Sequence, residues 1–121
     1  MNKIRVGQFS QSPNMLVIKK LKLLPEFELE ISNVQSSPAQ FQSLQSDELD
    51  IALTSPDNVL LFGTTAENPI GVLCELNILR SIDKGLKLSL VSNSDAHRVE
   101  DLQSLRFSID SPASGFSFLL K

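Results

Sequence analysis

The chain has 121 residues, of which 41% are hydrophobic and 21% are charged, and its formal net charge is −3. This composition is typical of one soluble globular domain with a single core. It argues against nucleic acid as a partner, because Trp and Tyr are absent and the pI is about 5.0. No run approaches the roughly 18 to 20 apolar residues of a membrane span.

The first ten residues lack the apolar region of a signal peptide. We therefore expect the chain as written to stay in the cytoplasm, or to act in the periplasm or at the cell surface if a leader has been removed. One cysteine, Cys74, excludes an internal disulfide and a multi-cysteine metal site. Its apolar surroundings, "GVLCELNIL", predict a buried and inert thiol.

The first half of the chain is predicted to alternate between strand and helix. Residues 3–9 suit a strand, and residues 13–24 suit a helix that begins at a proline. The inward face of this helix is expected to carry Val17, Leu21 and Leu24. Lysines 19, 20 and 22 are interpreted as its solvated face. Residues 27–34 alternate strictly between apolar and polar side chains, which predicts a strand near a sheet edge.

The alternation continues with a helix from Ser37 to about residue 49, in which Phe41 and Leu44 face inward. The segment "DIAL", residues 50–53, is short and continuously apolar, which predicts a central parallel strand covered on both faces. Residues 55–63 are predicted to form a third helix, closed by Gly63. Short connections between alternating strands and helices predict an α/β fold, with a mostly parallel sheet flanked by helices and right-handed crossovers.

The second half of the chain is less regular. We favour a strand from about Leu76 to Ile82 over a helix, and a further strand at 86–93. A short helical turn at 101–105, a strand at 106–110 and the beginning of a helix at 111–121 complete the prediction.

Three connections share one chemistry at equivalent strand ends. They are residues 10–14, 54–58 and 111–115, and each combines hydroxyl side chains with a proline that suits the first turn of a helix. Helix N-termini with unsatisfied N–H groups bind anions and acceptor oxygens, and ligands of open parallel sheets bind beyond the carboxyl ends of strands. Each loop alone is also explained as an ordinary helix cap. Three together favour a ligand site.

Catalytic motifs are missing from the sequence. There is no G-x-G-x-x-G, G-x-x-x-x-G-K-[ST], H-E-x-x-H or G-x-S-x-G pattern. The only histidine, His97, has Asp95 and Glu100 nearby, which leaves open both a catalytic dyad and a solvated loop histidine. The sequence offers binding groups rather than a catalytic set, so we expect no cofactor and no metal site.

Four segments together resemble the periplasmic substrate-binding proteins of ABC transporters, in the branch that includes aliphatic-sulfonate, nitrate and thiamin-pyrimidine binders. They are "IRVGQFSQSPNMLVIKK", "SDELDIALTSPDNVL", "DKGLKLSLVSN" and "VEDLQSLRFSIDSPASGFSFLLK". The resemblance covers nearly the whole chain. It implies a type 2 periplasmic-binding-protein-like fold, in which two α/β lobes clamp the ligand between them.

The resemblance also implies a division of the chain. Residues 1–85 would form lobe one, with the order β-α-β-α-β-α-β, and residues 86–121 would form the hinge-crossing strand and the start of a second lobe. That lobe is expected to be incomplete, because the chain is about half as long as a typical family member. The ligand-binding residues implied are Ser10, Gln11, Asn14, Thr54, Ser55 and Asn58 from lobe one, with Ser114 and Gly115 from lobe two.

The function implied is that of a solute-binding protein, which binds a small polar or anionic ligand without changing it and has an ABC permease as a partner. An alternative is a cytosolic enzyme on the same fold, similar to menaquinone-pathway enzymes or thiamin-pyrimidine synthases, with His97 carrying the chemistry. A third hypothesis is the effector domain of a LysR-type regulator. It would need a helix-turn-helix before the first strand, and we expect no room for one after Met1.

The C-terminal segment predicts self-association. Phe116, Leu119 and Leu120 form an apolar helical face at the end of the chain. Exposed apolar patches of this kind usually become interfaces. We therefore expect a homodimer through the C-terminal segment.

Overall fold

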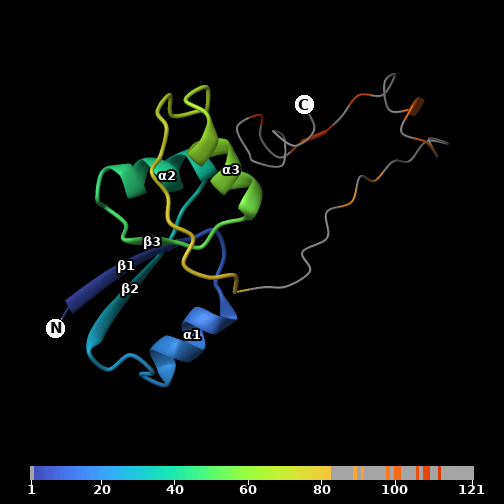
Figure 1. The fold of residues 1–121 in the computed structure, drawn as a ribbon. Helices are drawn as coiled ribbons and strands as arrows, with labels where there is room; N and C mark the ends of the chain where they lie inside the picture. Colours follow the sequence, from blue (N-terminus) through green and yellow to red (C-terminus); the bar gives the residue numbers. More distant parts are fainter. Residues whose placement is uncertain are drawn as a thin grey trace. The chain divides into compact units, whose positions relative to one another are not determined.

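A computed structural model describes residues 2–82 and, beyond them, only residues 89, 91, 98, 100–101, 106, 108–109 and 112. Strands and helices alternate along residues 2–64, which confirms the predicted α/β class (Figure 1). The elements are β1 (Asn2–Gln8), α1 (Pro13–Lys20), β2 (Phe27–Asn33), α2 (Ser37–Gln45), β3 (Ile51–Ala52) and α3 (Pro56–Thr64).

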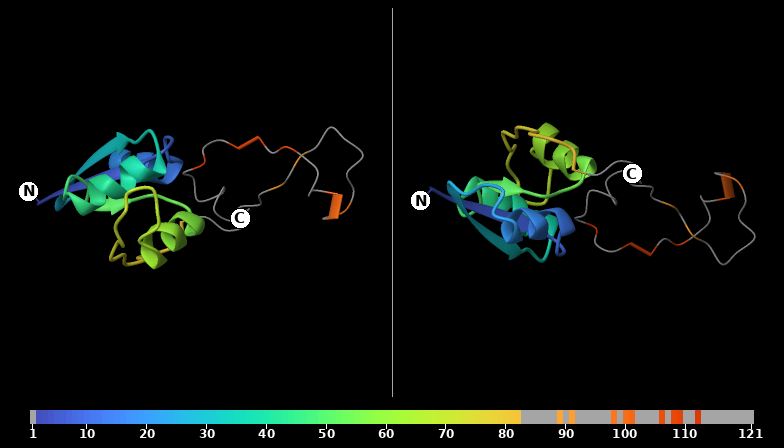
Figure 2. Two further views of the ribbon diagram at one scale, coloured as in Figure 1. Left: turned by 90° about the horizontal axis from the view of Figure 1, so that it is seen from above. Right: turned by 90° about the horizontal axis from the view of Figure 1, so that it is seen from below.

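The three strands form an open parallel sheet in the order β2-β1-β3. The chain moves from β1 to β2 on one side and then returns across β1 to reach β3. Since crossovers between parallel strands are right-handed, these opposite movements place α1 and α2 on opposite faces of the sheet. Figure 1 shows α1 on one side of the strands and α2 with α3 on the other, and the two views of Figure 2 bring α2 and α1 to the front in turn.

The register explains which side chains share a face. Val6 pairs with Ile31 of β2 and Ile51 of β3, so these three apolar side chains lie on the α1 face. Gly7 lies on the opposite face, where a Cβ atom would stand only 2.5 Å from Leu49 Cδ1. Glycine at this position therefore lets the segment after α2 pack directly against β1.

The core lies between α2 and α3. Phe41 of α2 and Phe62 of α3 are fully buried and stack with ring centroids 4.2 Å apart and an interplanar angle of 11°. Leu61 and Cys74 complete the buried cluster, with the amide of Cys74 donating to the carbonyl oxygen of Phe62 at 2.9 Å. The predictions that Phe41 faces inward and that Cys74 is buried are confirmed.

An exposed ion pair fixes the position of β3 beside β1. The backbone N–H and the guanidinium of Arg5 both donate to the carboxylate of Asp50, over distances of 2.7 to 3.0 Å. The amide of Asp50 donates in return to the carbonyl oxygen of Arg5 at 2.9 Å. These hydrogen bonds from Arg5 lower the pKa of Asp50 to about 2.

Helix α1 differs from its prediction in length and in contacts. It ends at Lys20, and the left-handed backbone of Lys22, with φ of 48°, turns the chain away from the helix. None of its residues is buried, and the predicted inward residues Val17 and Leu21 are 49% and 64% exposed. The apolar spacing therefore identified a helix but not a face that packs tightly on the sheet.

The segment 50–53 contains a strand parallel to β1, as predicted, but this strand is shorter and less covered than expected, and the strand predicted at 76–82 is wrong. β3 has only two paired residues, both half-buried, and lies at an edge of the described sheet rather than at its centre. The expected strand from Leu76 to Ile82 does not form, since residues 73–82 have no regular secondary structure. Its sequence lacks strict alternation, with Ile78 and Leu79 both 76% exposed, and so short a β3 offers few backbone partners.

The predicted strand at 86–93 and the elements from 101 onward fall largely outside the described residues. The boundary near residue 85 therefore stays a prediction. The apolar face of Phe116, Leu119 and Leu120, and with it the expected dimer, also lies outside the described part of the chain.

Candidate functional site

The carboxyl ends of β1 and β3 lie side by side and deliver two polar loops to one edge of the sheet. The loop after β1 contains residues 9–12 and leads into α1, and the loop after β3 contains residues 53–55 and leads into α3. The strand order changes direction between these two strands. In open α/β sheets, ligands bind outside the carboxyl ends at such a switch point.

All three helices have a serine at the N-cap and a proline in the first two helical positions, but only two of these serines cap their helix through the side chain. The hydroxyl of Ser12 accepts from the amide of Met15 at 3.4 Å, and that of Ser36 accepts from Ala39 at 3.3 Å. Ser55 stands at the same position before α3, with no side-chain cap hydrogen bond. The Ser55 hydroxyl therefore has a different environment from the other two, although the local sequences are alike.

Asn58 holds the hydroxyl groups of the β3–α3 loop. Its side-chain Nδ2 donates to Thr54 Oγ1 at 3.1 Å and to Ser55 Oγ at 3.2 Å. Asn58 is buried, whereas Thr54 and Ser55 are partly accessible. Because both hydroxyl oxygens accept from this amide, the hydroxyl hydrogens are left to donate elsewhere. The pair is thus suited to binding an acceptor oxygen.

Gln40 of α2 ties the two strand ends together from the other side. This side chain is fully buried, and its Nε2 donates to the carbonyl oxygens of Gly7 and Leu53, each at 3.1 Å. Two buried oxygens near the beginnings of α2 and α3, namely Gln40 Oε1 and Asp57 Oδ2, have no hydrogen-bond partner among the described residues.

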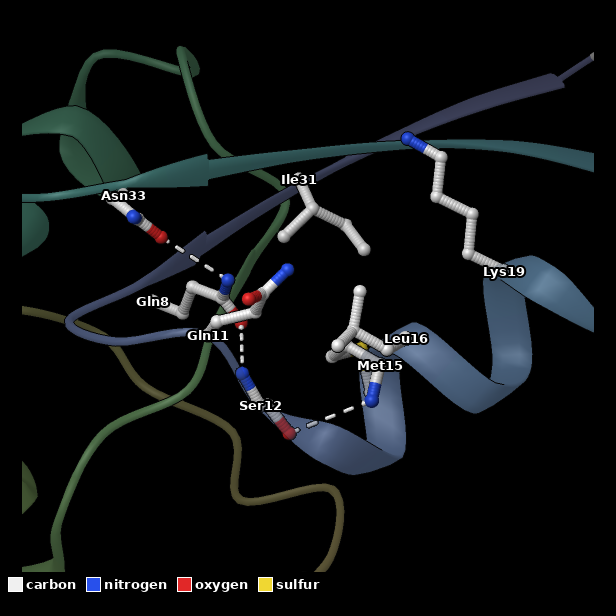
Figure 3. Close-up of a pocket in the computed structure, with 8 residues that line it drawn as sticks. All are labelled: Gln8, Gln11, Ser12, Met15, Leu16, Lys19, Ile31 and Asn33. Atoms are coloured by element: carbon white, nitrogen blue, oxygen red, sulfur yellow. Dashed lines mark hydrogen bonds between the residues drawn. The ribbon is translucent and has the colours of Figure 1, made fainter.

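The β1–α1 loop is positioned by Gln8 at the end of β1. Its Nε2 donates to Asn33 Oδ1 at 3.1 Å, and its Oε1 accepts from the amide of Ser12 at 3.1 Å. A hollow of about 370 Å³ opens beside these hydrogen bonds, between α1 and the sheet. Figure 3 shows the Gln11 side chain directed into it. Its lining consists of Gln8, Gln11, Ser12, Met15, Leu16, Lys19, Ile31 and Asn33.

The residues expected to bind ligand are therefore distributed over two places. Thr54, Ser55 and Asn58 contact one another in the β3–α3 loop, and Gln11 lines the hollow beside α1. Ser10 and Asn14 are exposed and lie outside the lining of the hollow. Ser114, Gly115 and His97 fall outside the described residues, so the roles expected of them stay predictions.

Sequence reasoning missed the polar residues that support these loops. Gln8 continues the buried row of Val6 on one face of β1, and Gln40 shares a helical face with Leu44. A polar residue on an otherwise apolar face was the available indication in both cases. Asp57 could have been noticed only as an acidic residue in the first turn of a helix, which is common and unspecific.

Other functional features are lacking in the described part of the chain. Its residues include no group of three His, Cys, Asp or Glu side chains placed to hold a metal ion. Within the same residues, no helix is both long enough and apolar enough to cross a membrane. Comparisons with protein-family models, curated proteins and solved structures find no match for the chain.

Proposed function

We propose that the chain contributes a ligand-binding lobe of a solute-binding protein, similar to those that serve ABC transporters. It binds a small polar or anionic molecule at the carboxyl ends of β1 and β3 and leaves it chemically unchanged. One observation carries this proposal: Ser55 does not cap α3 and instead accepts, together with Thr54, from the buried amide of Asn58.

The chemistry of this loop favours a ligand with acceptor oxygens. Two hydroxyl hydrogens and the N-terminal end of α3 meet at one place, and both are favourable for negative charge. The carboxylate of Asp57 in the first turn opposes a high negative charge, because like charges repel strongly where water is excluded. We therefore favour singly charged groups such as sulfonate, nitrate or carboxylate over a phosphate dianion.

The resemblance found in the sequence adds a second side to this site. Residues from 86 onward would begin an opposing lobe, and Ser114 and Gly115 would approach the same ligand from there. Closure of two lobes excludes water and strengthens each hydrogen bond to the ligand. A ligand that is clamped in this way would be delivered to a membrane permease, which is the partner that the resemblance implies.

A thermal-shift screen tests the proposal. The panel contains sulfonates, nitrate, carboxylates, phosphonates and pyrimidines. A ligand present at about 100 times its Kd adds roughly 2.7 kcal/mol to the free energy of unfolding. For a domain of this size, that corresponds to a rise in Tm on the order of 10 °C.

Two substitutions in the β3–α3 loop test whether the ligand that raises Tm binds there. Thr54→Val and Ser55→Ala should each reduce the rise in Tm, because each removes one hydroxyl donor from the ligand. Ser36→Ala is the matched control, since Ser36 is likewise an N-cap serine and its hydroxyl accepts from the amide of Ala39 as a cap of α2. A panel without any stabilising ligand contradicts the proposal, as does a rise that persists unchanged in Thr54→Val and Ser55→Ala.

A further inference from the structure

The hollow between α1 and the sheet has the properties of a second binding site. Helix α1 has no buried residue, so it covers its face of the sheet without filling the space beneath it. The resulting volume of about 370 Å³ lies within the usual range for small-molecule pockets, roughly 300 to 1,000 Å³. Its lining shares Gln11 and Ser12 with the β1–α1 loop but does not include Thr54, Ser55 or Asn58, so the hollow is separate from the hydroxyl pair of the β3–α3 loop.

The lining changes in character from one end of the hollow to the other. Amide side chains stand at the end near the β1–α1 loop, where Gln11 and Asn33 are exposed (Figure 3). Leu16 and Ile31 face each other across the middle and supply apolar walls. Lys19 stands at the far end. Between Ser12 and Lys19 the helix rises by about 10 Å, which sets the length of the hollow.

The charge of Lys19 is available to a ligand. Glu30 of β2 already forms a salt bridge with Lys3, in which Lys3 Nζ lies 2.6 Å from Glu30 Oε2. The hydrogen bond from Lys3 is the main reason why the pKa of Glu30 is lowered, and Lys19 contributes only a smaller effect through space. The side-chain ammonium of Lys19 makes no hydrogen bond or ion pair with any residue of the described part.

The amide side chains at the other end of the hollow also keep hydrogen-bonding groups available to a ligand. Asn33 accepts from Gln8 through Oδ1, which leaves its Nδ2 hydrogens to donate. Gln11 has no hydrogen bond from its side-chain amide within the described residues, and Figure 3 shows that amide directed into the hollow. Both amides can therefore bind a polar group that donates or accepts.

We propose that this hollow binds a straight-chain organic anion with a polar group at its far end. The charged end pairs with Lys19, the apolar chain lies along Leu16 and Ile31, and the polar end reaches the amides of Gln11 and Asn33. Such a ligand matches the order of cation, apolar wall and amide along the hollow. A short inorganic anion would leave the apolar walls exposed, and a cation would meet Lys19 unfavourably.

A titration followed by ¹H–¹⁵N NMR at constant ionic strength tests this assignment, with ω-hydroxyhexanoate as the probe. We expect saturable shifts of backbone amides in α1 and at the end of β2. Acetate lacks the chain and aminohexanol carries the opposite charge, so neither should produce them. Equal binding of acetate or aminohexanol would overturn the proposal, and so would the absence of saturable shifts with ω-hydroxyhexanoate.

Paired variants identify the charge and the wall. Lys19→Gln should weaken binding several-fold, whereas Lys20→Gln, one residue further along the helix and outside the lining, should not. Leu16→Glu places a negative charge in the hollow and should abolish binding, while Leu21→Glu, at a more exposed position beyond the hollow, should leave it intact. Equal effects within either pair would refute the assignment.

A third variant separates this site from the solute site. Thr54→Val should leave the response to ω-hydroxyhexanoate unchanged, because Thr54 does not line the hollow. Loss of the response in Thr54→Val would place the anion at the β3–α3 loop, which overturns the second site and supports the proposed function. Saturable shifts in α1 with ω-hydroxyhexanoate, combined with a thermal-shift panel that yields no stabilising ligand, would support the second site and contradict the proposed function.

Discussion

Replacing Phe62 with alanine is expected to destabilise the fold more than any change on the solvent side of α3. Phe62 is fully buried and stacks on Phe41 at 4.2 Å. A buried phenylalanine removes roughly 150 to 250 Å² from water, at about 25 cal/mol per Å². Phe62→Ala removes most of this stabilisation from apolar burial, and the cavity that remains destabilises the fold further. We expect the free energy of unfolding to fall by about 3 to 5 kcal/mol.

That loss is a large fraction of the stability of a small domain, which is typically about 5 to 15 kcal/mol. Urea unfolding followed by circular dichroism measures it, provided that Phe62→Ala still folds. Phe62→Leu serves as the milder variant if it does not, because it keeps much of the apolar volume. Leu60→Ala is the control on the same helix, since Leu60 is 50% exposed and its truncation should cost far less. Equal losses for Phe62→Ala and Leu60→Ala would refute the α2–α3 core.

Three further outcomes are expected from changes elsewhere in the described residues. Ser36→Ala should lower the free energy of unfolding by about 1 kcal/mol in urea unfolding because it removes a cap hydrogen bond, whereas Ser55→Ala should change it little; the reverse order would contradict the environment of Ser55. The ion pair between Asp50 and Arg5 should stabilise the fold fully above about pH 4 and lose its effect as the pH falls through about 2, because the pKa of Asp50 is lower in the folded state than in the unfolded state. Plots of Tm against pH for the wild type and Asp50→Asn that stay parallel across this range would disprove it. The Cys74 thiol should react with a thiol reagent only when the protein unfolds, because burial raises its pKa and hides its sulfur; rapid labelling of the folded chain would contradict the packing of that segment.

The sequence contained enough information for the first two strands and for the starts of the helices. The strict alternation of residues 27–34 predicted β2 from the two-residue period of a strand, and the strand predicted at residues 3–9 matches β1 to within one residue at each end. A proline in the first two positions marked the start of each helix in the described part. The helix ends were less predictable, because the left-handed turn at Lys22 occurs in a residue with no preference for it. The length of β3 depended on pairing with β1, which no local pattern encodes.

The candidate site was predictable in its location and not in its internal arrangement. The loop from Thr54 to Asn58 was identified because hydroxyl residues and a proline followed an apolar strand. That the side chain of Asn58 would bond the hydroxyl of the N-cap residue Ser55 depends on the burial of Asn58, which is a tertiary effect. The role of Gln40 was missed for the same reason, since its partners are the backbone carbonyls of Gly7 in β1 and of Leu53 just after β3.

The most direct measurement for the central claim is a ¹H–¹⁵N NMR titration of the chain with methanesulfonate at constant ionic strength. The proposed site predicts saturable shifts of the backbone amides of residues 54–58, and predicts that they disappear in Ser55→Ala while persisting in Ser36→Ala. Shifts that grow linearly without saturation, or that persist in Ser55→Ala, would contradict a ligand site at the carboxyl ends of β1 and β3.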